Sequence, residues 1–391
     1  MRVVLGVTGG IAAYKAAELI RSWRRSGDEV RVMMTAHATR FITPMTLGVL
    51  SGHEVFLDMF PEHGREAVDH VDLGKWADVL VVAPATANIL AKFARGLADD
   101  QLSTYYLAHP GPVVLAPAMN VHMWDHPAVR ENLEILIQRG VILVEPESGE
   151  LACGDWGQGR LAEIPAIVAA SRRAGNPEPL LTGRKILVTA GPTREPIDPV
   201  RFLSNPSTGK MGVHLAAEAY REGATVTLVH GPLSTEPPYG VTSIPVSTAG
   251  EMTDAVLSRA GEADLLLMTA AVGDFKLNEI SSEKIRRTGN SLPLTLEPTA
   301  DILASVRKAC PDLTIVAFAA ETTLDETRVR EKMAAKGADF IVANDVSDSS
   351  IGFASDHNEV FIYPRQGPSI HLPRSSKSDI ARRILQHVVR S

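Results

Sequence analysis

A glycine–lysine pair lies in the segment FLSNPSTGKMG, residues 202–212, where a strand-like run gives way to a helical pattern. This order is typical of phosphate-binding turns, but the segment does not fit the standard nucleotide loop G-x-x-x-x-G-K-[ST]. Ser204 stands at the position of that loop's first glycine, and Met211 stands where a magnesium-binding hydroxyl is needed. The segment therefore raises the question of what Lys210 lies next to, and why Asn205 precedes it.

A second candidate site lies at the amino terminus, in the segment GVTGGIAAYK. Gly9 and Gly10 there open a helical pattern directly after a strand-like run. The free amides and the dipole of a helix start favour an anion such as a phosphate. Because G-x-G-x-x-G is absent, a mononucleotide such as a flavin phosphate fits better than a dinucleotide. A glycine turn with a purely structural role is the alternative.

Three further residues of the first half have side chains suited to acid–base or binding chemistry. His70 lies in the acidic segment VDHVDL, although a lone histidine is more often structural. Asn120 follows a buried strand in PAMNVHMW, where its amide can hold a carboxylate or a carbonyl. Cys153 lies among glycines in LACGDWGQGRL, close to Arg160. That setting favours a reactive thiol, or a proton donor on a closing flap, over a structural cysteine.

Short apolar runs alternate with helical patterns in both halves of the chain. The runs include RVVLGV, EVRVMMT, DVLVVAPA and PVVLAPAM in the first half, and KILVTAG, ATVTLVHG, DLLLMTAAV, TIVAFAAE and DFIVAND in the second. Runs of this length suit parallel strands buried on both faces. The alternation predicts an α/β chain with two doubly wound, Rossmann-like domains. Ligands bind such sheets at the carboxyl ends of the strands, which here carry small residues, Thr, Asn and Asp.

The length and the composition set limits on the class of protein. A chain of 391 residues is long for one core, and the polar stretch RRAGNPEPLLTGRK predicts a boundary near residues 174–184, between domains over 1–178 and 183–391. The formal charge of −7 argues against a nucleic-acid-binding surface. No apolar run reaches the roughly 18 residues needed to span a bilayer, and the amino terminus lacks the plan of a signal peptide. With Cys153 and Cys310 as the only cysteines, a cytoplasmic protein is expected.

The first half resembles the flavin-dependent cysteine decarboxylases, and most closely the phosphopantothenoylcysteine decarboxylases. The resemblance covers residues 1–170 and rests on TGGIAAYK, APATANILAKFARGLADD, PAMNVHMW and LACGDWGQGRL. It implies a homo-oligomer that binds FMN near a subunit interface. The implied residues are Gly9, Gly10 and Ile11 at the FMN phosphate, Thr35, Thr86 and Asn88 in the flavin pocket, His70 as catalytic histidine, Met119 and Asn120 at the substrate carboxylate, and Cys153 as proton donor.

The resemblance also implies a reaction. Loss of CO₂ from an acyl-cysteine leaves a carbanion without a resonance sink, and flavin oxidation of the thiol to a thioaldehyde provides one. The reduced flavin then returns the hydride while Cys153 supplies a proton, so that no net redox change occurs. In this scheme the flavin carries the difficult step, and the protein contributes orientation and acid–base chemistry.

The second half, over residues 183–391, is similar to the phosphopantothenate–cysteine ligases in the bacterial form that is fused to the decarboxylase. The segment VTAGPTREPIDPVRFLSNPSTGKMG carries the likeness. It implies that Asn205 is catalytic at an activated acyl group and that Arg201 binds substrate. It also implies that the helix starting near Lys210 lies close to substrate and nucleotide. Lys284 in SSEKIRR matches a flap lysine that stabilises phosphate charge, although a solvated charge cluster is the alternative.

Further segments of the second half match nucleotide-binding segments of the ligases. The implied residues are Ala270, Asp274, Lys284, Ala300, Asp301, Ile302, Leu303, Phe318, Lys332 and Lys336, with Asp274 also implied as a magnesium ligand. Lys332 and Lys336 share one helix face, which a solvated surface stripe explains equally well. Departures from the family pattern occur at Pro206, Gly273, Ala300, Arg286 and Arg287. They leave the type of charge intact and bear on loop stiffness and rates.

The implied ligase reaction has two steps. The carboxylate of 4′-phosphopantothenate attacks the α-phosphate of CTP, which gives an acyl-cytidylate and pyrophosphate. The amine of L-cysteine then displaces CMP, and the amide product feeds the decarboxylase half. Mg²⁺ accompanies the triphosphate, with few direct carboxylate ligands. The preference for CTP and an assembly of decarboxylase trimers with ligase dimers follow from the resemblance alone.

Two other classes of function remain as alternatives. One is a non-catalytic flavoprotein that regulates a partner, against which the joint presence of His70, Asn120 and Cys153 counts. The other is an NAD(P) oxidoreductase built on two doubly wound domains. The absence of a G-x-G-x-x-G fingerprint in either half disfavours it.

Overall fold

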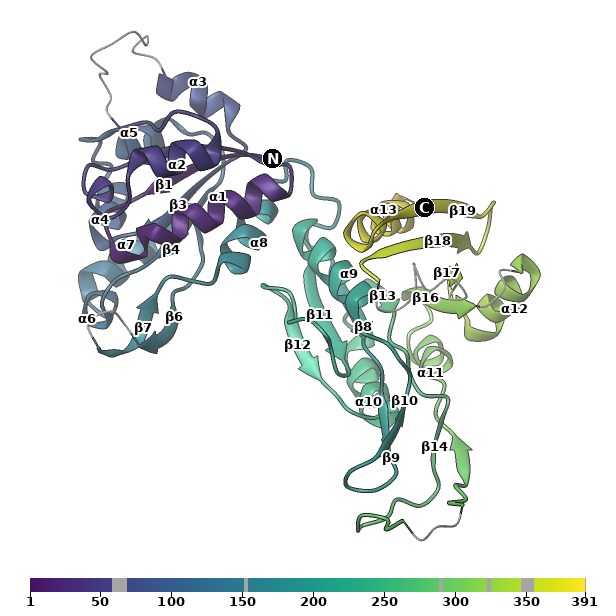
Figure 1. Ribbon diagram of the computed structural model, residues 1–391. Helices are drawn as coiled ribbons and strands as arrows, with labels where there is room; N and C mark the ends of the chain where they lie inside the picture. Colours follow the sequence, from purple (N-terminus) through teal and green to yellow (C-terminus); the bar gives the residue numbers. More distant parts are fainter. Residues whose placement is uncertain (58–68, 151–153, 288–290, 322–324, 346–354, 391) are drawn as a thin grey trace. The chain divides into compact units, whose positions relative to one another are not determined.

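The chain forms two compact units, Met1–Glu178 and Pro179–Ser391, named unit 1 and unit 2 here. Figure 1 shows the computed structural model, in which each unit is built around its own sheet. The structure describes residues 1–57, 69–150, 154–287, 291–321, 325–345 and 355–390, with only the backbone described at 69–71. Within these ranges, no helix is both long enough and apolar enough to cross a membrane.

Unit 1 contains a parallel sheet in the order β2-β1-β3-β4-β5. Its strands are β1 Arg2–Val7, β2 Glu29–Met34, β3 Val79–Ala85, β4 Val113–Pro117 and β5 Ile142–Leu143. Successive side chains of a strand point to opposite faces, and in β1 Val3 and Leu5 enter one core layer while Val4 enters the other. Burial on both faces explains why these strands read as continuous apolar runs.

Helices cover both faces of the unit 1 sheet. They are η1 Ile11–Lys15, α1 Ala16–Arg25, η2 Ala38–Arg40, α2 Pro44–Ser51, α3 Asp69–Trp76, α4 Ala87–Arg95, α5 Gln101–Ala108, α6 Val121–Trp124, α7 Pro127–Gln138 and α8 Ile164–Ala174. One core layer packs α1, α2 and α8 on the sheet, and the other packs α4, α5 and α7. A separate hairpin, β6 Glu147–Glu150 with β7 Trp156–Arg160, lies beside α6.

Unit 2 contains a sheet in the order β12-β11-β8-β13-β16-β17-β18-β19. Its strands are β8 Lys185–Ala190, β11 Thr225–His230, β12 Thr242–Pro245, β13 Leu265–Met268, β16 Thr314–Glu321, β17 Phe340–Asp345, β18 His357–Pro364 and β19 Ile370–Ser376. The first six strands in this order are parallel, whereas β18 and β19 add an antiparallel edge. No pattern in the sequence predicted that edge.

The helices of unit 2 are α9 Lys210–Arg221, α10 Ala249–Ala260, α11 Ile302–Ala309, α12 Glu326–Lys336 and α13 Lys377–Arg390. Helices α9 and α13 pack in one core layer, and α10, α11 and α12 pack in the other. In Figure 1, β9 Arg194–Pro196, β10 Phe202–Ser204 and β14 Phe275–Leu277 extend away from the sheet. Strand β9 pairs with β10, and β14 pairs with β15 Leu296–Pro298, both antiparallel. The predicted α/β class with a doubly wound sheet in each half is confirmed.

Candidate functional site

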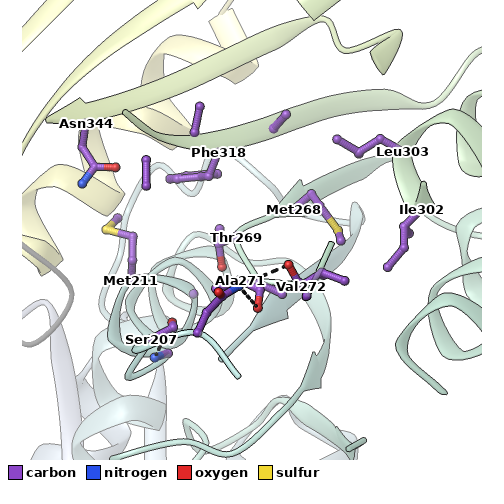
Figure 2. A pocket seen from close by; sticks show the side chains of 18 of the residues that line it. Ser207, Met211, Met268, Thr269, Ala271, Val272, Ile302, Leu303, Phe318 and Asn344 are labelled. Carbon is purple, nitrogen blue, oxygen red and sulfur yellow. Dashed lines mark hydrogen bonds between the residues drawn. The ribbon is translucent and has the colours of Figure 1, made fainter. Parts of the chain in front are cut away.

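A cavity of about 770 Å³ opens in unit 2 at the carboxyl ends of its parallel strands, where β13, β16 and β17 end and α9 begins. Figure 2 shows Met268, Phe318 and Asn344 on its wall. The following residues predicted from the sequence line it: Asn205, Ala270, Asp274, Ala300, Asp301, Ile302, Leu303, Phe318, Lys332 and Lys336. Because these residues come from separate segments, the fold brings most of the predicted ligase site into one place.

Asn205 is held at the rim of this cavity by the end of a neighbouring strand. Its side-chain Nδ2 donates to the carbonyl oxygens of Ala271 and Val272 at 3.2 and 3.3 Å. Asn205 is not the cap of the following helix, since Gly209 occupies that position. With the donor group engaged, Oδ1 is the atom through which this side chain can accept a hydrogen bond from a bound group.

The start of α9 approaches the strand ends closely, and two glycines allow it. Gly209 has φ of 75°, and a Cβ on it would lie 2.3 Å from Leu233 Cδ2. A Cβ on Gly212 would lie 2.5 Å from Thr269 Oγ1. This close packing puts Lys210 in the cavity wall, where its Nζ pairs with Asp356 Oδ1 at 2.6 Å. The lysine that follows the glycine thus lies in the wall of a cavity and beside a carboxylate.

Lys332 and Lys336 both line the cavity, and each forms an ion pair. Lys332 Nζ lies 2.9 Å from Glu321 Oε1, and Lys336 Nζ lies 3.4 Å from Asp301 Oδ2. Asp301 also caps α11, where Oδ1 accepts from the backbone N–H of Ala304 at 3.1 Å. A bound phosphate therefore has to compete with carboxylates for these two lysines.

Lys377 is a cavity residue that the sequence analysis missed. It is the first residue of α13, lines the cavity and is only 3% exposed. The pKa of Lys377 is lowered to about 8, first by burial and then by the positive charge of Lys210, while Asp356 opposes both effects. No local motif in the sequence marks Lys377. Asn344, also in the cavity wall, lies at the end of the strand-like run DFIVAND, a position that favours ligand binding.

Arg201 and Lys284 are not among the residues that line the cavity. Arg201 lies in the turn between β9 and β10, and Lys284 lies in the irregular segment 281–287. The two segments meet, because Arg201 Nη1 donates to the carbonyl oxygen of Ile285 at 3.0 Å. The structure therefore brings these two predicted residues toward each other.

In unit 1 the glycine turn after β1 lies against two other strand ends. The Gly10 N–H donates to the Thr8 carbonyl at 3.0 Å, and the Gly10 backbone is extended at the start of η1. A Cβ on Gly9 would lie 2.4 Å from His37 Cβ, so only glycine fits there. At Gly10 the nearest side-chain atom is Thr86 Cγ2, at 3.6 Å from such a Cβ. The turn therefore places the Gly10 backbone next to Thr86.

The other predicted flavin residues surround this turn. The Thr35 N–H donates to the Val7 carbonyl at 3.1 Å just after β2, and Thr86 caps the start of α4. Ile11 and Asn88 are exposed, in η1 and in the first turn of α4. Backbone amides at a glycine turn with small polar side chains nearby fit the phosphate of a mononucleotide.

Met119 and Asn120 lie at the end of β4, against the β6–β7 hairpin. The Met119 N–H donates to the Gly159 carbonyl at 2.9 Å, and Asn120 Nδ2 donates to Asp155 Oδ2 at 2.9 Å. Asn120 Oδ1 accepts from the His122 N–H at 2.8 Å and caps α6. His70 belongs to α3 by its backbone, while its side chain and the whole of Cys153 lie outside the described residues.

A dedicated metal cluster is absent from the described part of the chain, where no three His, Cys, Asp or Glu side chains are grouped to hold an ion. Asp274 is exposed at the cavity rim. A single carboxylate there fits a magnesium ion that takes most of its ligands from phosphates and water.

Two known families match the chain. The DNA/pantothenate metabolism flavoprotein C-terminal domain matches residues 181–391, and the Flavoprotein family matches residues 1–174. The coenzyme A biosynthesis bifunctional protein CoaBC of Bacillus subtilis is 45% identical over 389 residues, which is 99% of this chain and 96% of that protein. The chain belongs to the CoaBC family. The family inferred from the sequence motifs is thereby confirmed.

Other members of the CoaBC family and a solved structure are similar to this chain. CoaBC of Escherichia coli K12 is 42% identical over 393 residues, covering 99% of this chain and 96% of that protein. A crystal structure of the C-terminal domain of a CoaBC protein is 38% identical, covers 54% of this chain and 97% of that domain, and has a TM-score of 0.47. Both CoaBC relatives are named as bifunctional proteins of coenzyme A biosynthesis.

Proposed function

We propose that this chain is a bifunctional enzyme that makes 4′-phosphopantothenoylcysteine in unit 2 and decarboxylates it in unit 1. The observation that carries the proposal is the CoaBC match along the whole chain, at 45% identity. In unit 2, CTP activates the carboxylate of 4′-phosphopantothenate and L-cysteine takes over the acyl group. In unit 1, the product loses CO₂ to give 4′-phosphopantetheine. A cytoplasmic location suits these small, soluble substrates.

In the ligase step, Asn205 acts at the acyl group. Its Nδ2 is held by the carbonyl oxygens of Ala271 and Val272, which fixes the plane of the amide. Oδ1 then accepts a hydrogen bond from the cysteine amine and orients it toward the acyl carbon. Orientation of this kind removes much of the entropic part of the barrier.

The phosphates of CTP lie along the basic residues of the cavity wall. Lys332 and Lys336 exchange their carboxylate partners for phosphate oxygens, and Lys210 contributes charge from the start of α9. Lys284 reaches the phosphates from the segment 281–287 and stabilises charge as pyrophosphate leaves. Asp274 supplies one oxygen to Mg²⁺, whose other ligands are phosphates and water.

The base and ribose lie near the apolar residues of the same wall. Ala270, Ala300, Ile302, Leu303 and Phe318 provide that surface, and Ile302 and Leu303 are buried. The Asp301 carboxylate lies beside these residues, where its Oδ1 caps α11 by accepting from the Ala304 N–H. An apolar wall with few fixed polar groups is the usual composition of a nucleotide pocket.

In unit 1, Gly9, Gly10 and Ile11 hold the phosphate of FMN, and Thr35, Thr86 and Asn88 surround the flavin. The flavin, when bound, supplies the two-electron chemistry of the decarboxylation. Met119 and Asn120 meet the substrate carboxylate, and the Asn120–Asp155 hydrogen bond at 2.9 Å orients that amide. His70 moves a proton at the substrate, and Cys153 supplies the final proton.

The chain works as a homo-oligomer, with decarboxylase trimers and ligase dimers. Exposed apolar side chains support this in unit 1, where Met45 is 79% and Val49 is 78% exposed on α2. In unit 2, Phe202 and Phe275 are exposed on the hairpins that leave the sheet. Exposed apolar side chains mark protein–protein contacts where they form a contiguous patch.

Incubation with 4′-phosphopantothenate, L-cysteine, Mg²⁺ and each nucleoside triphosphate in turn tests the proposal. With CTP, we expect mass spectrometry to detect CMP, pyrophosphate and 4′-phosphopantetheine. The purified protein should be yellow from bound flavin. Asn205→Ala should stop ligation while the protein still decarboxylates added 4′-phosphopantothenoylcysteine. A colourless protein after flavin reconstitution that also releases no pyrophosphate would contradict both assignments. Cys153→Ser that releases CO₂ as fast as the wild type would favour a regulatory flavoprotein for unit 1.

A further inference from the structure

The carboxylate of Asp198 joins two loops of unit 2 that the cavity does not include. Its Oδ1 accepts from the N–H groups of Val200 and Arg201, both at 2.8 Å. Its Oδ2 accepts from Arg201 Nη1 at 3.1 Å and from the Ile285 N–H at 3.2 Å. The side chain has no exposed surface. These four residues form a group called the Asp198 junction.

Further hydrogen bonds hold the same two loops together. Arg201 Nη1 also donates to the Ile285 carbonyl at 3.0 Å, so one nitrogen bridges both loops. The Ser281 N–H donates to the Ile197 carbonyl at 3.1 Å. Since the bridge uses only Nη1, the remaining N–H groups of the guanidinium can contact an anionic substrate.

The electrostatics of the junction require a carboxylate. Bonds from three backbone amides and the Arg201 charge lower the pKa of Asp198 although its burial opposes this, so the group stays ionised at neutral pH. Four donors meet two oxygens, and an asparagine would present an NH₂ group to two of them in either amide orientation. Buried donors that lose their acceptor are costly, more so when one is charged.

We propose that Asp198 is a positioning residue of the ligase, which fixes Arg201 and the backbone next to Lys284 at one spacing. The inference rests on the proposed function, in which Arg201 binds the acid substrate and Lys284 reaches the phosphates. The junction holds the backbone N–H of Arg201 and that of Ile285, the residue after Lys284. It explains how an exposed loop such as 281–287 can present a lysine at a defined place.

The test compares Asp198→Asn with Asp339→Asn in the full chain. Asp339 Oδ2 also joins an arginine to a backbone amide, accepting from Arg307 Nη2 at 2.7 Å and from the Ile315 N–H at 2.9 Å. It lies at the amino end of β17, at the edge of the sheet opposite the cavity. We expect Asp198→Asn to raise KM for 4′-phosphopantothenate about tenfold and to lower kcat. Asp339→Asn should leave both within about twofold, at a comparable loss of thermal stability.

A second pair of variants asks whether Asp198 acts through Arg201. In an Arg201→Ala background, Asp198→Asn should change KM for the acid by less than about threefold, because the positioned group is gone. An undiminished effect in that background would overturn the inference, as would equal behaviour of the two Asn variants. Should Asp198→Asn not fold, Asp198→Glu keeps the charge and displaces it by one methylene. Normal KM and kcat in Asp198→Glu would also overturn it.

The failure of this inference is distinguishable from that of the proposed function. If the wild type releases no pyrophosphate from CTP with acid and cysteine, the proposed function fails and the variants have no activity to compare. If the wild type is active and Asp198→Asn matches Asp339→Asn, only the positioning role of Asp198 fails.

Discussion

The two units stabilise the same place in their sheets with the same residue type. In unit 1, Thr8 follows β1 and its Oγ1 accepts from the Thr86 N–H at 3.1 Å and donates to the Pro84 carbonyl at 2.7 Å. In unit 2, Thr189 in β8 accepts at Oγ1 from the N–H groups of Thr269 and Ala270, both at 3.1 Å. Each hydroxyl is buried and ties the first strand of its unit to the turn after the neighbouring strand.

The difference between the units begins directly after these threonines. In unit 1 the chain turns at Gly9 and enters η1 at once, and this glycine turn is the surface proposed to bind the FMN phosphate. In unit 2 the β9–β10 hairpin separates β8 from α9 along the chain. Asn205 and Lys210 follow this hairpin in the sequence and line the cavity. The same strand-end hydroxyl thus supports a short turn in unit 1, proposed to hold the cofactor, and a longer loop in unit 2, proposed to take part in ligation.

Closing the space at the unit 1 turn should have the largest effect. A Cβ on Gly9 would lie 2.4 Å from His37 Cβ and 2.9 Å from the His37 backbone carbon, so Gly9→Ala forces the turn to rebuild. We expect this variant to lose at least about tenfold in FMN affinity, measured by flavin fluorescence titration of the apoprotein. Ligation in unit 2 should stay within about twofold of the wild type.

Gly10→Ala is the matched control for that substitution. The nearest side-chain atom to a Cβ there is Thr86 Cγ2, at 3.6 Å, which is an ordinary contact distance. Flavin affinity should therefore fall far less than in Gly9→Ala. Equal losses in the two variants would mean that the turn does not bind the flavin through the packing of Gly9.

The loss of local stability on replacing each threonine by valine should increase with the number of backbone N–H groups that its hydroxyl accepts from. Thr189→Val leaves two part-buried N–H groups without an acceptor and should cost about 2–4 kcal/mol of local stability, while Thr8→Val leaves one and should cost about 1–2 kcal/mol. Hydrogen exchange of the amides of Thr269, Ala270 and Thr86 in the full chain measures both. The comparison fails if Thr8→Val opens its turn more than Thr189→Val does.

Thr253→Val provides the reference for loss of a buried hydroxyl that accepts from no amide. Thr253 Oγ1 donates to the Ala249 carbonyl within α10, and the residue is buried. Its removal leaves no N–H unsatisfied, so local exchange around residue 253 should change by less than about 1 kcal/mol.

A substitution where α9, the first helix of unit 2, packs on the strand ends should reduce the stability of that unit by a smaller amount. An alanine inside a helix normally stabilises it over glycine by about 0.5–1 kcal/mol. At Gly212, however, a Cβ would lie 2.5 Å from Thr269 Oγ1 and 2.6 Å from Ala190 Cβ. We expect Gly212→Ala to destabilise unit 2 by about 1–2 kcal/mol net and to weaken CTP binding. Gly250→Ala in α10, with its nearest atom at 3.8 Å, should be neutral or stabilising in the same calorimetric scans.

The sequence predicted most of the parallel strands of both sheets because their burial on two faces leaves a continuous apolar run, as in Val79–Ala85. It also predicted most of the residues of the unit 2 cavity, because the carboxyl ends of parallel strands gather at one edge of the sheet. Ala271 and Val272, which bond to Asn205, follow one of these strand ends. The family resemblance supplied the roles that periodicity alone could not.

The residues that escaped prediction depend on pairings between distant segments. Asp198 lies in a short turn, and its partner Ile285 belongs to another loop, so neither periodicity nor a motif connects them. Lys377 starts a helix that follows the antiparallel edge β18–β19, and only the path of that edge brings it to the cavity. His70 and Cys153 stay predictions, because the described residues include neither side chain.

The smallest expected effect is a pH dependence confined to unit 2. Lys377, whose pKa is lowered to about 8, loses its proton as the pH rises from about 7 to about 9. Of the groups beside it, Asp356 has a pKa lowered by Lys210, and His214 has a pKa lowered by burial and then by Lys377. Asp356 therefore stays charged and His214 neutral across this range, so the change in charge there comes from Lys377.

We expect CTP binding, measured by calorimetry without cysteine, to weaken about threefold from pH 7.5 to 9.5, and Lys377→Met to remove that change. The free energy of unfolding should change in the opposite direction to CTP affinity as the pH rises. The folded pKa lies below the unfolded value of about 10.4, so the native state binds fewer protons between pH 8 and 10.4 and the free energy of unfolding rises there. Flavin retention by unit 1 in the same samples should not follow this curve. A CTP affinity that falls equally in Lys377→Met would assign the titration to another group.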